Sequence, residues 1–137
     1  MLALFLGGCL IVRADETDLG EPCPTTQPEL LADASGPFVL RDAIYFVDGN
    51  GVIAMLAYGG GTPAELTTEP VHAGRLVADT AALYWTADDG VMRMPLTGGA
   101  PAALVSGYPD PSALAVDDSH VVWGSSAGLY RWAKADE

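Results

Sequence analysis

One strand-turn-strand pattern recurs along this chain at a nearly constant spacing, and it limits the fold more than any other feature. Its clearest copy occupies residues 83–99, where an aromatic segment, an Asp-Asp-Gly turn and a second apolar segment end in two glycines. The spacing is 39 or 38 positions for each of three landmark pairs: Tyr45 and Tyr84, Gly51 and Gly90, and Trp85 and Trp123. A period of about 40 residues indicates stacked repeat units, because one such unit cannot bury both of its faces alone.

The repeat predicts an all-β fold in which four short antiparallel strands form each unit, as in the blades of a β-propeller. The expected strands are residues 37–41, 43–48, 51–58 and 63–67, then 74–78, 82–87, 90–95 and 101–105, and finally 112–116, 120–125 and 128–134. The 16 glycines and 10 prolines are spaced as the turns of such a fold require. The sequence therefore predicts a partial propeller within residues 27–137. Its blades lie at about 37–67, 74–105 and 112–134, and the last blade is incomplete.

Residues 28–31 share a Pro-x-x-Leu pattern with the outermost strand of the first two blades, so we expect an N-terminal outer strand there. Three blades are fewer than the 4 to 8 of known propellers. The chain is then a piece of a longer reading frame, an open array, or one half of a six-bladed ring that two copies close. We favour missing blades first and the homodimer second, because exposed strand edges and blade faces otherwise aggregate.

The second repeat unit carries a recognisable motif. It reads Leu83-Tyr84-Trp85-Thr86, then Asp88 or Asp89, then Val91-x-Arg93-x-x-Leu96-x-Gly98. This resembles the YWTD repeat of LDL-receptor-type six-bladed propellers, and equally the blades of bacterial secreted and lipoprotein propellers, including NHL-like ones. The resemblance covers residues 27–134. Seven residues carry the structural repeat: Tyr45, Tyr84, Trp85, Asp88, Arg93, Trp123 and Arg131.

The resemblance also implies roles for two of the polar repeat positions. The acidic residue after the YWT segment mainly ties one blade to the next, and the third blade, which reads Val122-Trp123-Gly124-Ser125, lacks it. The arginine position, Arg93 and Arg131, contacts a neighbouring strand or blade, and the first blade lacks it. The aromatic residues pair on adjacent strands, and packing between the sheets is their expected role.

The first 12 residues are apolar, which is too short to span a bilayer and is typical of the end of a secretory signal. Leu6-Gly7-Gly8-Cys9 resembles a bacterial lipobox, in which Cys9 would be lipidated. Residues 13–26 are acidic and rich in Pro and Thr, as in a flexible tether. We therefore expect an exported protein, in the periplasm or at the outer membrane or cell surface, attached to a membrane through this lipid. Otherwise Cys9 and Cys23 pair in an oxidising compartment.

The charge balance excludes some partners. Six Lys and Arg against 18 Asp and Glu give a net charge of −12, which repels nucleic acid and anionic membrane surfaces. We expect a protein or carbohydrate ligand, and no cofactor.

No catalytic or metal-binding group stands out. Asp117, Ser119 and His120 are the residue types of a nucleophilic triad, but neighbours on one turn point apart. His72, the other histidine, lies in a different blade. The segment 48–51 has too few oxygen ligands for calcium, and we expect it to form a hairpin turn because Asn-Gly tolerates positive φ.

These observations favour a non-catalytic binding or scaffold module, with its ligand at the top face or central channel, where the loops of all blades meet. Changes in the loops 108–111 and 117–118 would test that surface. The alternative is a propeller hydrolase or lyase with a metal in the central channel. Its acidic ligands would be the three carboxylates near inner-strand ends, Asp33, Asp79 and Asp117.

Overall fold

The computed structural model describes residues 4–6, 9–11 and 30–134. The chain divides into two compact units, Met1–Leu30 and Leu31–Glu137. In the first unit, β1 (Leu4–Leu6) and β2 (Cys9–Ile11) pair as an antiparallel hairpin. The predicted tether at 13–26 and Cys23 lie outside the described residues. The same holds for the side chain of Cys9, so its lipidation stays a prediction.

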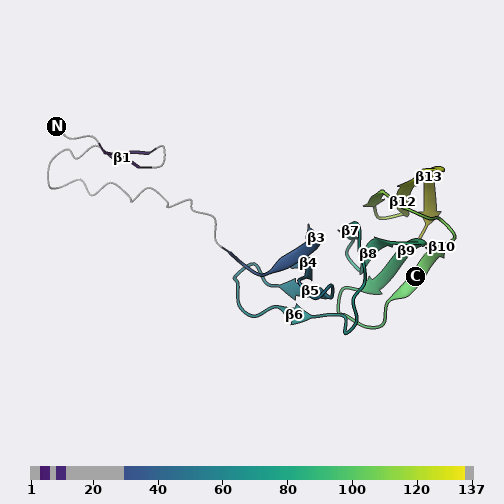
Figure 1. Ribbon diagram of the computed structural model, residues 1–137, viewed down its shortest axis with the longest axis horizontal. Helices are drawn as coiled ribbons and strands as arrows, with labels where there is room; N and C mark the ends of the chain where they lie inside the picture. Colours follow the sequence, from purple (N-terminus) through teal and green to yellow (C-terminus); the bar gives the residue numbers. More distant parts are fainter. Residues whose placement is uncertain (1–3, 7–8, 12–29, 135–137) are drawn as a thin grey trace. The chain divides into compact units, whose positions relative to one another are not determined.

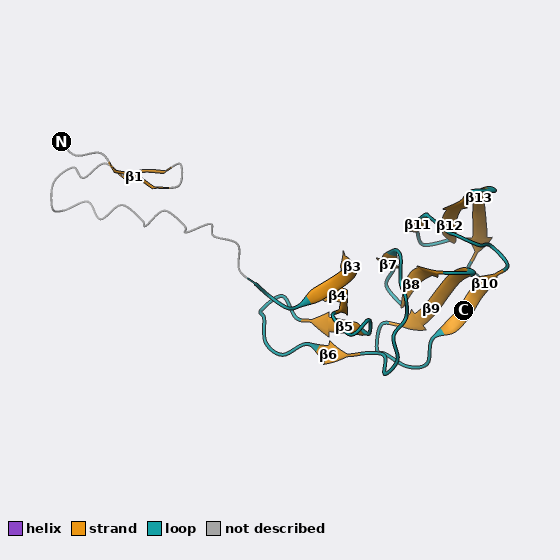
Figure 2. Ribbon diagram, viewed as in Figure 1, coloured by secondary structure: helices purple, strands orange, loops and turns teal. Residues whose placement is uncertain are grey.

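The second unit consists of three antiparallel sheets that follow one another along the chain (Figures 1 and 2). The strands of each sheet are hydrogen-bonded in chain order, so each sheet is a meander. Sheet 1 holds β3 (Ala34–Leu40), β4 (Ile44–Asp48), β5 (Ile53–Leu56) and β6 (Ala64–Glu65). Sheet 2 holds β7 (Leu76–Ala78), β8 (Ala82–Ala87), β9 (Gly90–Pro95) and β10 (Ala102–Ser106). Sheet 3 holds β11 (Ala113–Val116), β12 (His120–Ser125) and β13 (Gly128–Ala133).

The predicted all-β fold is confirmed, and the strands fall where the repeat places them. The bounds of β8, β9 and β12 agree with the prediction, and the other strands shift by a few residues at their ends. The described part of the chain contains no helix, and therefore none that could cross a membrane. The assignment of these sheets to a propeller stays a prediction.

Two details of the prediction are wrong. Leu30 and Leu31 do not lie in a strand, and residues 27–29 lie outside the described part. Gly51 is not the counterpart of Gly90. The cross-strand pairs Val47–Ile53 in sheet 1 and Thr86–Val91 in sheet 2 occupy the same register, so the counterpart of Gly90 is Val52.

The physical reason lies in the hairpin turn between β4 and β5, which is one residue longer than the turn between β8 and β9. The backbone N–H of Gly51 donates to the carbonyl of Asp48 over 3.0 Å, and Gly51 has a φ of 83°. Asn50 keeps a negative φ, so the turn is a three-residue loop in which a glycine absorbs the extra residue.

The sheets pack face to face through the same register positions twice. Between sheets 1 and 2, Tyr45 and Ile53 meet Leu83 and Trp85. Between sheets 2 and 3, the corresponding residues are Tyr84 and Val91 on one side and Val121 and Trp123 on the other. The first strands of the sheets adjoin, β3 beside β7 and β7 beside β11. Alternation along each strand thus gives sheet 2 two buried faces, because every residue faces the side opposite to its neighbour.

The outer faces of the array are the two that no sheet covers. On sheet 1 this face carries Phe38, which is 66% exposed, opposite Phe46, which is buried in a cluster with Ala54 and Leu56. On sheet 3 it carries Val122 and Leu129, and Leu129 is 77% exposed. Leu129 occupies the position at which Val91 of sheet 2 is fully buried.

Candidate functional site

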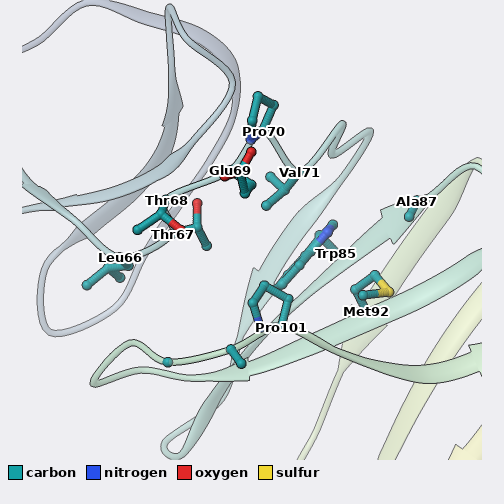
Figure 3. Close-up of a pocket in the computed structure, with 12 residues that line it drawn as sticks. Leu66, Thr67, Thr68, Glu69, Pro70, Val71, Trp85, Ala87, Met92 and Pro101 are labelled. Atoms are coloured by element: carbon teal, nitrogen blue, oxygen red, sulfur yellow. The ribbon is translucent and has the colours of Figure 1, made fainter.

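A groove of about 610 Å³ opens beside Trp85, between the segment that leaves β6 and the face of sheet 2 (Figure 3). We call it the Trp85 groove. One wall is formed by residues 66–71, and the opposite side by Met92 and residues 99–101. Most of its lining is apolar, with Thr67, Thr68 and Glu69 as the polar contributions. Its volume lies within the range of about 300–1,000 Å³ that is usual for ligand sites.

Local sequence explains why Trp85 lies at this place. In β8 the side chains alternate, so Leu83, Trp85 and Ala87 face sheet 1 while Tyr84 faces sheet 3. Trp85 pairs across the ladder with Met92 of β9, which also lines the groove. Trp85 is only 1% exposed, and its indole Nε1 has no acceptor among the described residues.

The wall at 66–71 is held to sheet 1 by hydrogen bonds, and the chain just after it is held to sheet 2. The Thr67 hydroxyl accepts the backbone N–H of Ile53 over 3.0 Å, and the N–H of Val71 donates to the carbonyl of Gly51 over 2.9 Å. Further along, His72 has a φ of 46°, and Gly74 donates to the carbonyl of Thr86 over 3.0 Å. The wall and the chain just after it are therefore fixed to the two sheets before any ligand arrives.

The junction between sheets 2 and 3 contains a similar connecting segment 38 residues later. Asp110 repeats the positive φ of His72 at 54°, and Ser112 donates to Gly124 as Gly74 does to Thr86. Three aromatic rings fill the space. The ring of Tyr108 lies 5.2 Å from that of Trp123 and 4.7 Å from that of Tyr130, both edge to face. Trp123 and Tyr130 stack at 5.7 Å.

A charged cluster joins the end of sheet 3 to sheet 2. Lys134 donates to Asp79 Oδ2 and to the backbone carbonyl of Asp117, and its Nζ lies 5.4 Å from the centre of the Tyr84 ring. The Tyr84 hydroxyl also donates to Asp79 Oδ2, over 2.9 Å. Burial raises the pKa of Asp79, but Lys134, the N–H groups of residues 81 and 82 and the Tyr84 hydroxyl outweigh it. They lower the pKa of Asp79 from 3.8 to about 2.

This shift predicts an acid-sensitive junction. Because the folded pKa of Asp79 is depressed, its stabilisation is present above pH 4 and is lost as the pH falls towards 2. We expect Asp79→Asn to lower the free energy of unfolding at pH 7 by about 1 to 2 kcal/mol after allowance for solvent screening, and to have little effect at pH 2. Urea unfolding at pH 7, 3 and 2 measures this.

Asp117→Asn is the matched control for that experiment. Asp117 accepts the same two backbone hydrogen bonds in its turn, but only its carbonyl contacts Lys134. Asp117→Asn should therefore lower the free energy of unfolding by less than Asp79→Asn does. An equal loss, or one that persists unchanged at pH 2, would mean that the contact between Lys134 and the Asp79 carboxylate contributes nothing.

The residues that suggested a triad form a turn. Asp117 Oδ1 accepts the backbone N–H groups of Ser119 and His120, each over 2.7 Å, and these hydrogen bonds lower the pKa of Asp117. His120 Nδ1 lies 3.9 Å from the same oxygen. Ser119 thus meets Asp117 through its backbone.

The three carboxylates considered for a channel metal occupy different places. Asp33 precedes β3, whereas Asp79 and Asp117 follow β7 and β11. Asp79 is engaged by Lys134, as described above. Among the described residues no group of three or more His, Cys, Asp or Glu is arranged to hold a metal ion.

The repeat residues divide into packing and connecting roles. Tyr45, Tyr84, Trp85 and Trp123 are buried between sheets. Arg93 and Arg131 share one register position, opposite Tyr84 and Val122, and Met55 takes that position in sheet 1.

The Asp88–Asp89 turn contacts the segment that leads to sheet 3. The backbone carbonyl of Asp88 accepts the N–H of Asp110 over 3.3 Å, and the carboxylate of Asp89 accepts the N–H of Gly107 over 3.3 Å. The carboxylate that makes this connection is therefore that of Asp89.

The loop residues expected at the binding face are part of the packing. Tyr108 is inserted between sheets 2 and 3, and Asp117 caps its own turn. Motif reasoning missed the Trp85 groove, because no motif marks the segment 66–71 that forms its wall.

Comparison with known proteins assigns no family. No family model and no curated protein matches the chain. Among solved structures, the chain is similar to the "Crystal structure of the computationally designed Ika4 protein", at 11% identity over 80% of this chain and 100% of that one. The TM-score is 0.44, and a likeness at that level carries no argument about fold or function.

Proposed function

We propose that this chain is a non-catalytic binding module built from β-propeller blades, and that the Trp85 groove is its ligand site. The observation that carries the proposal is the groove itself: a fixed, largely apolar hollow beside a buried tryptophan. Such hollows, lined by apolar side chains with a few polar groups, are the usual form of a ligand site.

The propeller assignment is supported by how the sheets repeat. Each sheet is a meander, the first strands adjoin, and both sheet-to-sheet contacts use the same register positions. Radial stacking of four-stranded meanders around their first strands is the propeller arrangement.

Binding is favoured over catalysis because the polar groups that could react are already engaged. The carboxylate of Asp79 holds Lys134 and the Tyr84 hydroxyl, and that of Asp117 caps a turn. The groove itself offers mainly packing surface. The ligand classes proposed are a peptide segment of a protein or a carbohydrate, both of which pack on aromatic rings.

The cellular setting that we propose is export, with attachment to a membrane through lipid on Cys9. Its support is the apolar segment at residues 1–12 and its lipobox-like ending. Mass spectrometry of the N-terminal peptide from the native host tests it, and an unmodified Cys9 would contradict lipidation.

The binding site is tested by the indole N–H resonance of Trp85 in the full chain, assigned with Trp85→Phe. We expect at least one probe from a panel of short peptides and oligosaccharides to shift this resonance saturably, while the resonance of Trp123 stays in place. Trp123 is the internal control because it is buried to a similar extent but does not line the groove. If no probe moves the Trp85 resonance, or if both tryptophans respond alike, the groove is not the site.

A further inference from the structure

A second cavity, of about 330 Å³, opens where the turn between β3 and β4 meets the residue that follows β9. Arg41 and Asp42 of that turn line it from sheet 1, and Thr80 and Leu96 line it from sheet 2. We call it the Arg41 pocket. It shares no lining residue with the Trp85 groove, so an assignment of this pocket does not rest on the proposed function.

Leu96 holds the place in the first junction that Lys134 holds in the second. The backbone N–H of Leu96 donates to the carbonyl of Ala81 over 3.1 Å. The N–H of Lys134 donates over 2.8 Å to the carbonyl of Ser119, which lies 38 positions after Ala81. Both side chains contact the preceding sheet: Lys134 reaches Asp79, and Leu96 packs on the cluster between sheets 1 and 2. Leu96 therefore takes the position of Lys134 without its ammonium group.

The carboxylate that receives this ammonium group in the second junction has an equivalent in the first. The Tyr84 hydroxyl donates to Asp79 Oδ2 over 2.9 Å, and the Tyr45 hydroxyl donates to Asp42 Oδ1 over 3.1 Å. Tyr45 and Tyr84 occupy the same register position. The first junction thus keeps the carboxylate and its tyrosine, while the cation that the chain supplies in the second is not supplied by Leu96.

Arg41 gives the first junction a positive charge that the second lacks at this position. The N–H of Arg41 donates to the carbonyl of Ala43 over 2.9 Å, in the role that Asp79 has towards Ala82 in a turn one residue longer. A guanidinium and a carboxylate therefore stand on neighbouring residues of one turn. Within the described part of the chain neither of them forms an ion pair.

We propose that the Arg41 pocket binds an α-amino acid with an apolar side chain, its ammonium group on Asp42 and its carboxylate on Arg41. Lys134 demonstrates the first contact, because it places an alkylammonium on a carboxylate that a tyrosine hydroxyl holds. The planar fork of a guanidinium suits the second. A simple amine is disfavoured because Arg41 repels it. Since the two charges of the pocket belong to adjacent residues, those of the ligand must also lie close together, and Leu96 offers apolar surface beside them.

Four compounds test this chemistry: L-leucine, leucinamide without the carboxylate, N-acetyl-leucine without the ammonium group, and glycine without the side chain. Both charged residues are exposed, so binding is weak and amide chemical shifts of the full chain are the suitable readout. We expect leucine to shift the resonances of residues 41, 42, 80 and 96 saturably, with at least fivefold tighter binding than each of the other three. If leucinamide or N-acetyl-leucine binds as well as leucine, or if leucine leaves these resonances in place, the proposal is refuted.

Two charge-removing variants test the assigned contacts. Asp42→Asn and Arg41→Gln should each weaken binding of leucine at least fivefold. Asp118→Asn is the matched control, because it removes the same charge from an exposed residue that lies 38 positions after Thr80 in the next junction. It should leave the affinity unchanged. An equal loss in the Asp42 and Asp118 variants would show a general effect of charge and contradict the site.

Leu96→Lys restores the internal cation, so its amino group should occupy Asp42 as that of Lys134 occupies Asp79. We expect at least tenfold weaker binding of leucine, whereas Leu96→Met, which is long but uncharged, should bind as the parent does. A Leu96→Lys variant that is folded by circular dichroism and keeps the parental affinity would overturn the proposal. The indole resonance of Trp85 should stay in place throughout. If leucine moves that resonance alone, it binds in the Trp85 groove, which would support the proposed function and refute the Arg41 pocket.

Discussion

Replacing Gly90 by alanine should destabilise this fold by about 3 to 5 kcal/mol. A Cβ at this position would lie 2.1 Å from the carbonyl oxygen of Val105, and Gly90 has a φ of 155°. The side chain therefore adds a clash to a strained backbone, each of which costs about 1 to 3 kcal/mol. Relief requires β10 to separate from β9, where Gly90 pairs with Ser106. Urea unfolding followed by tryptophan fluorescence gives the free energy.

Gly128→Ala is a matched control, because Gly128 occupies the same register position in sheet 3 with a φ of 151°. A Cβ there meets nothing closer than the Tyr130 hydroxyl at 3.8 Å. Only the strain of the backbone applies, and we expect about 1 to 2 kcal/mol. The difference between the two variants isolates the contact with Val105. Equal losses would show that β10 does not pack on the turn of sheet 2.

The strands could be predicted because this sequence repeats both its turn residues and its alternation of side chains along the strands. Residues 82–87 and 120–125 place aromatic residues at matching positions before a two-residue turn, and these strands were predicted to the residue. Local propensity, turn chemistry and burial agree there, so one answer satisfies all of them. The predicted register of the first hairpin is wrong because Gly51 lies at the repeat spacing from Gly90. Its φ of 83° instead belongs to a hairpin loop that is one residue longer than that of sheet 2.

The site could not be predicted in the same way. No motif marks the Trp85 groove. It lies between the segment 66–71 and the face of sheet 2, and the sequence alone does not show that this segment runs beside Trp85. The pairing of Lys134 with Asp79 joins residues 55 positions apart, so it also depends on how the sheets stack.

The outer faces of the array lead to the second large expected effect, which concerns assembly. Leu129 and Val122 on sheet 3 occupy the register positions of Val91 and Tyr84, which contact sheet 3 from sheet 2. On sheet 1, the exposed Phe38 occupies the register position of Leu76, which contacts sheet 1 from sheet 2, while the neighbouring Phe46 is already buried within the chain. By the rule that both internal junctions follow, the face of sheet 3 fits the face of sheet 1. We propose that a second copy of the chain packs the outer face of its sheet 1 on the outer face of sheet 3 of the first copy.

On the proposed propeller assignment, closure by a second copy is the alternative to missing blades. Known propellers have about 4 to 8 blades, and six is the only multiple of three in that range. In a six-bladed ring each copy would supply three sheets, which is half of the ring. A twofold axis would then relate two identical junctions, in each of which sheet 3 of one copy packs on sheet 1 of the other. We therefore expect native mass spectrometry and light scattering to give twice the mass of one chain. The measurement belongs at 0.15 M salt or above, because two chains of charge −12 repel each other.

Leu129→Glu tests the junction, because this side chain is 77% exposed and its replacement leaves the packing within one chain intact. We expect the variant to have the mass of a single chain, since a buried carboxylate without a partner is costly. Ser126→Glu places the same charge in the exposed turn of the same hairpin, outside the face, and should keep the double mass. A parent protein with the mass of one chain at high concentration would contradict self-closure. In that case other blades, and not a second copy, would have to cover the outer faces of sheets 1 and 3.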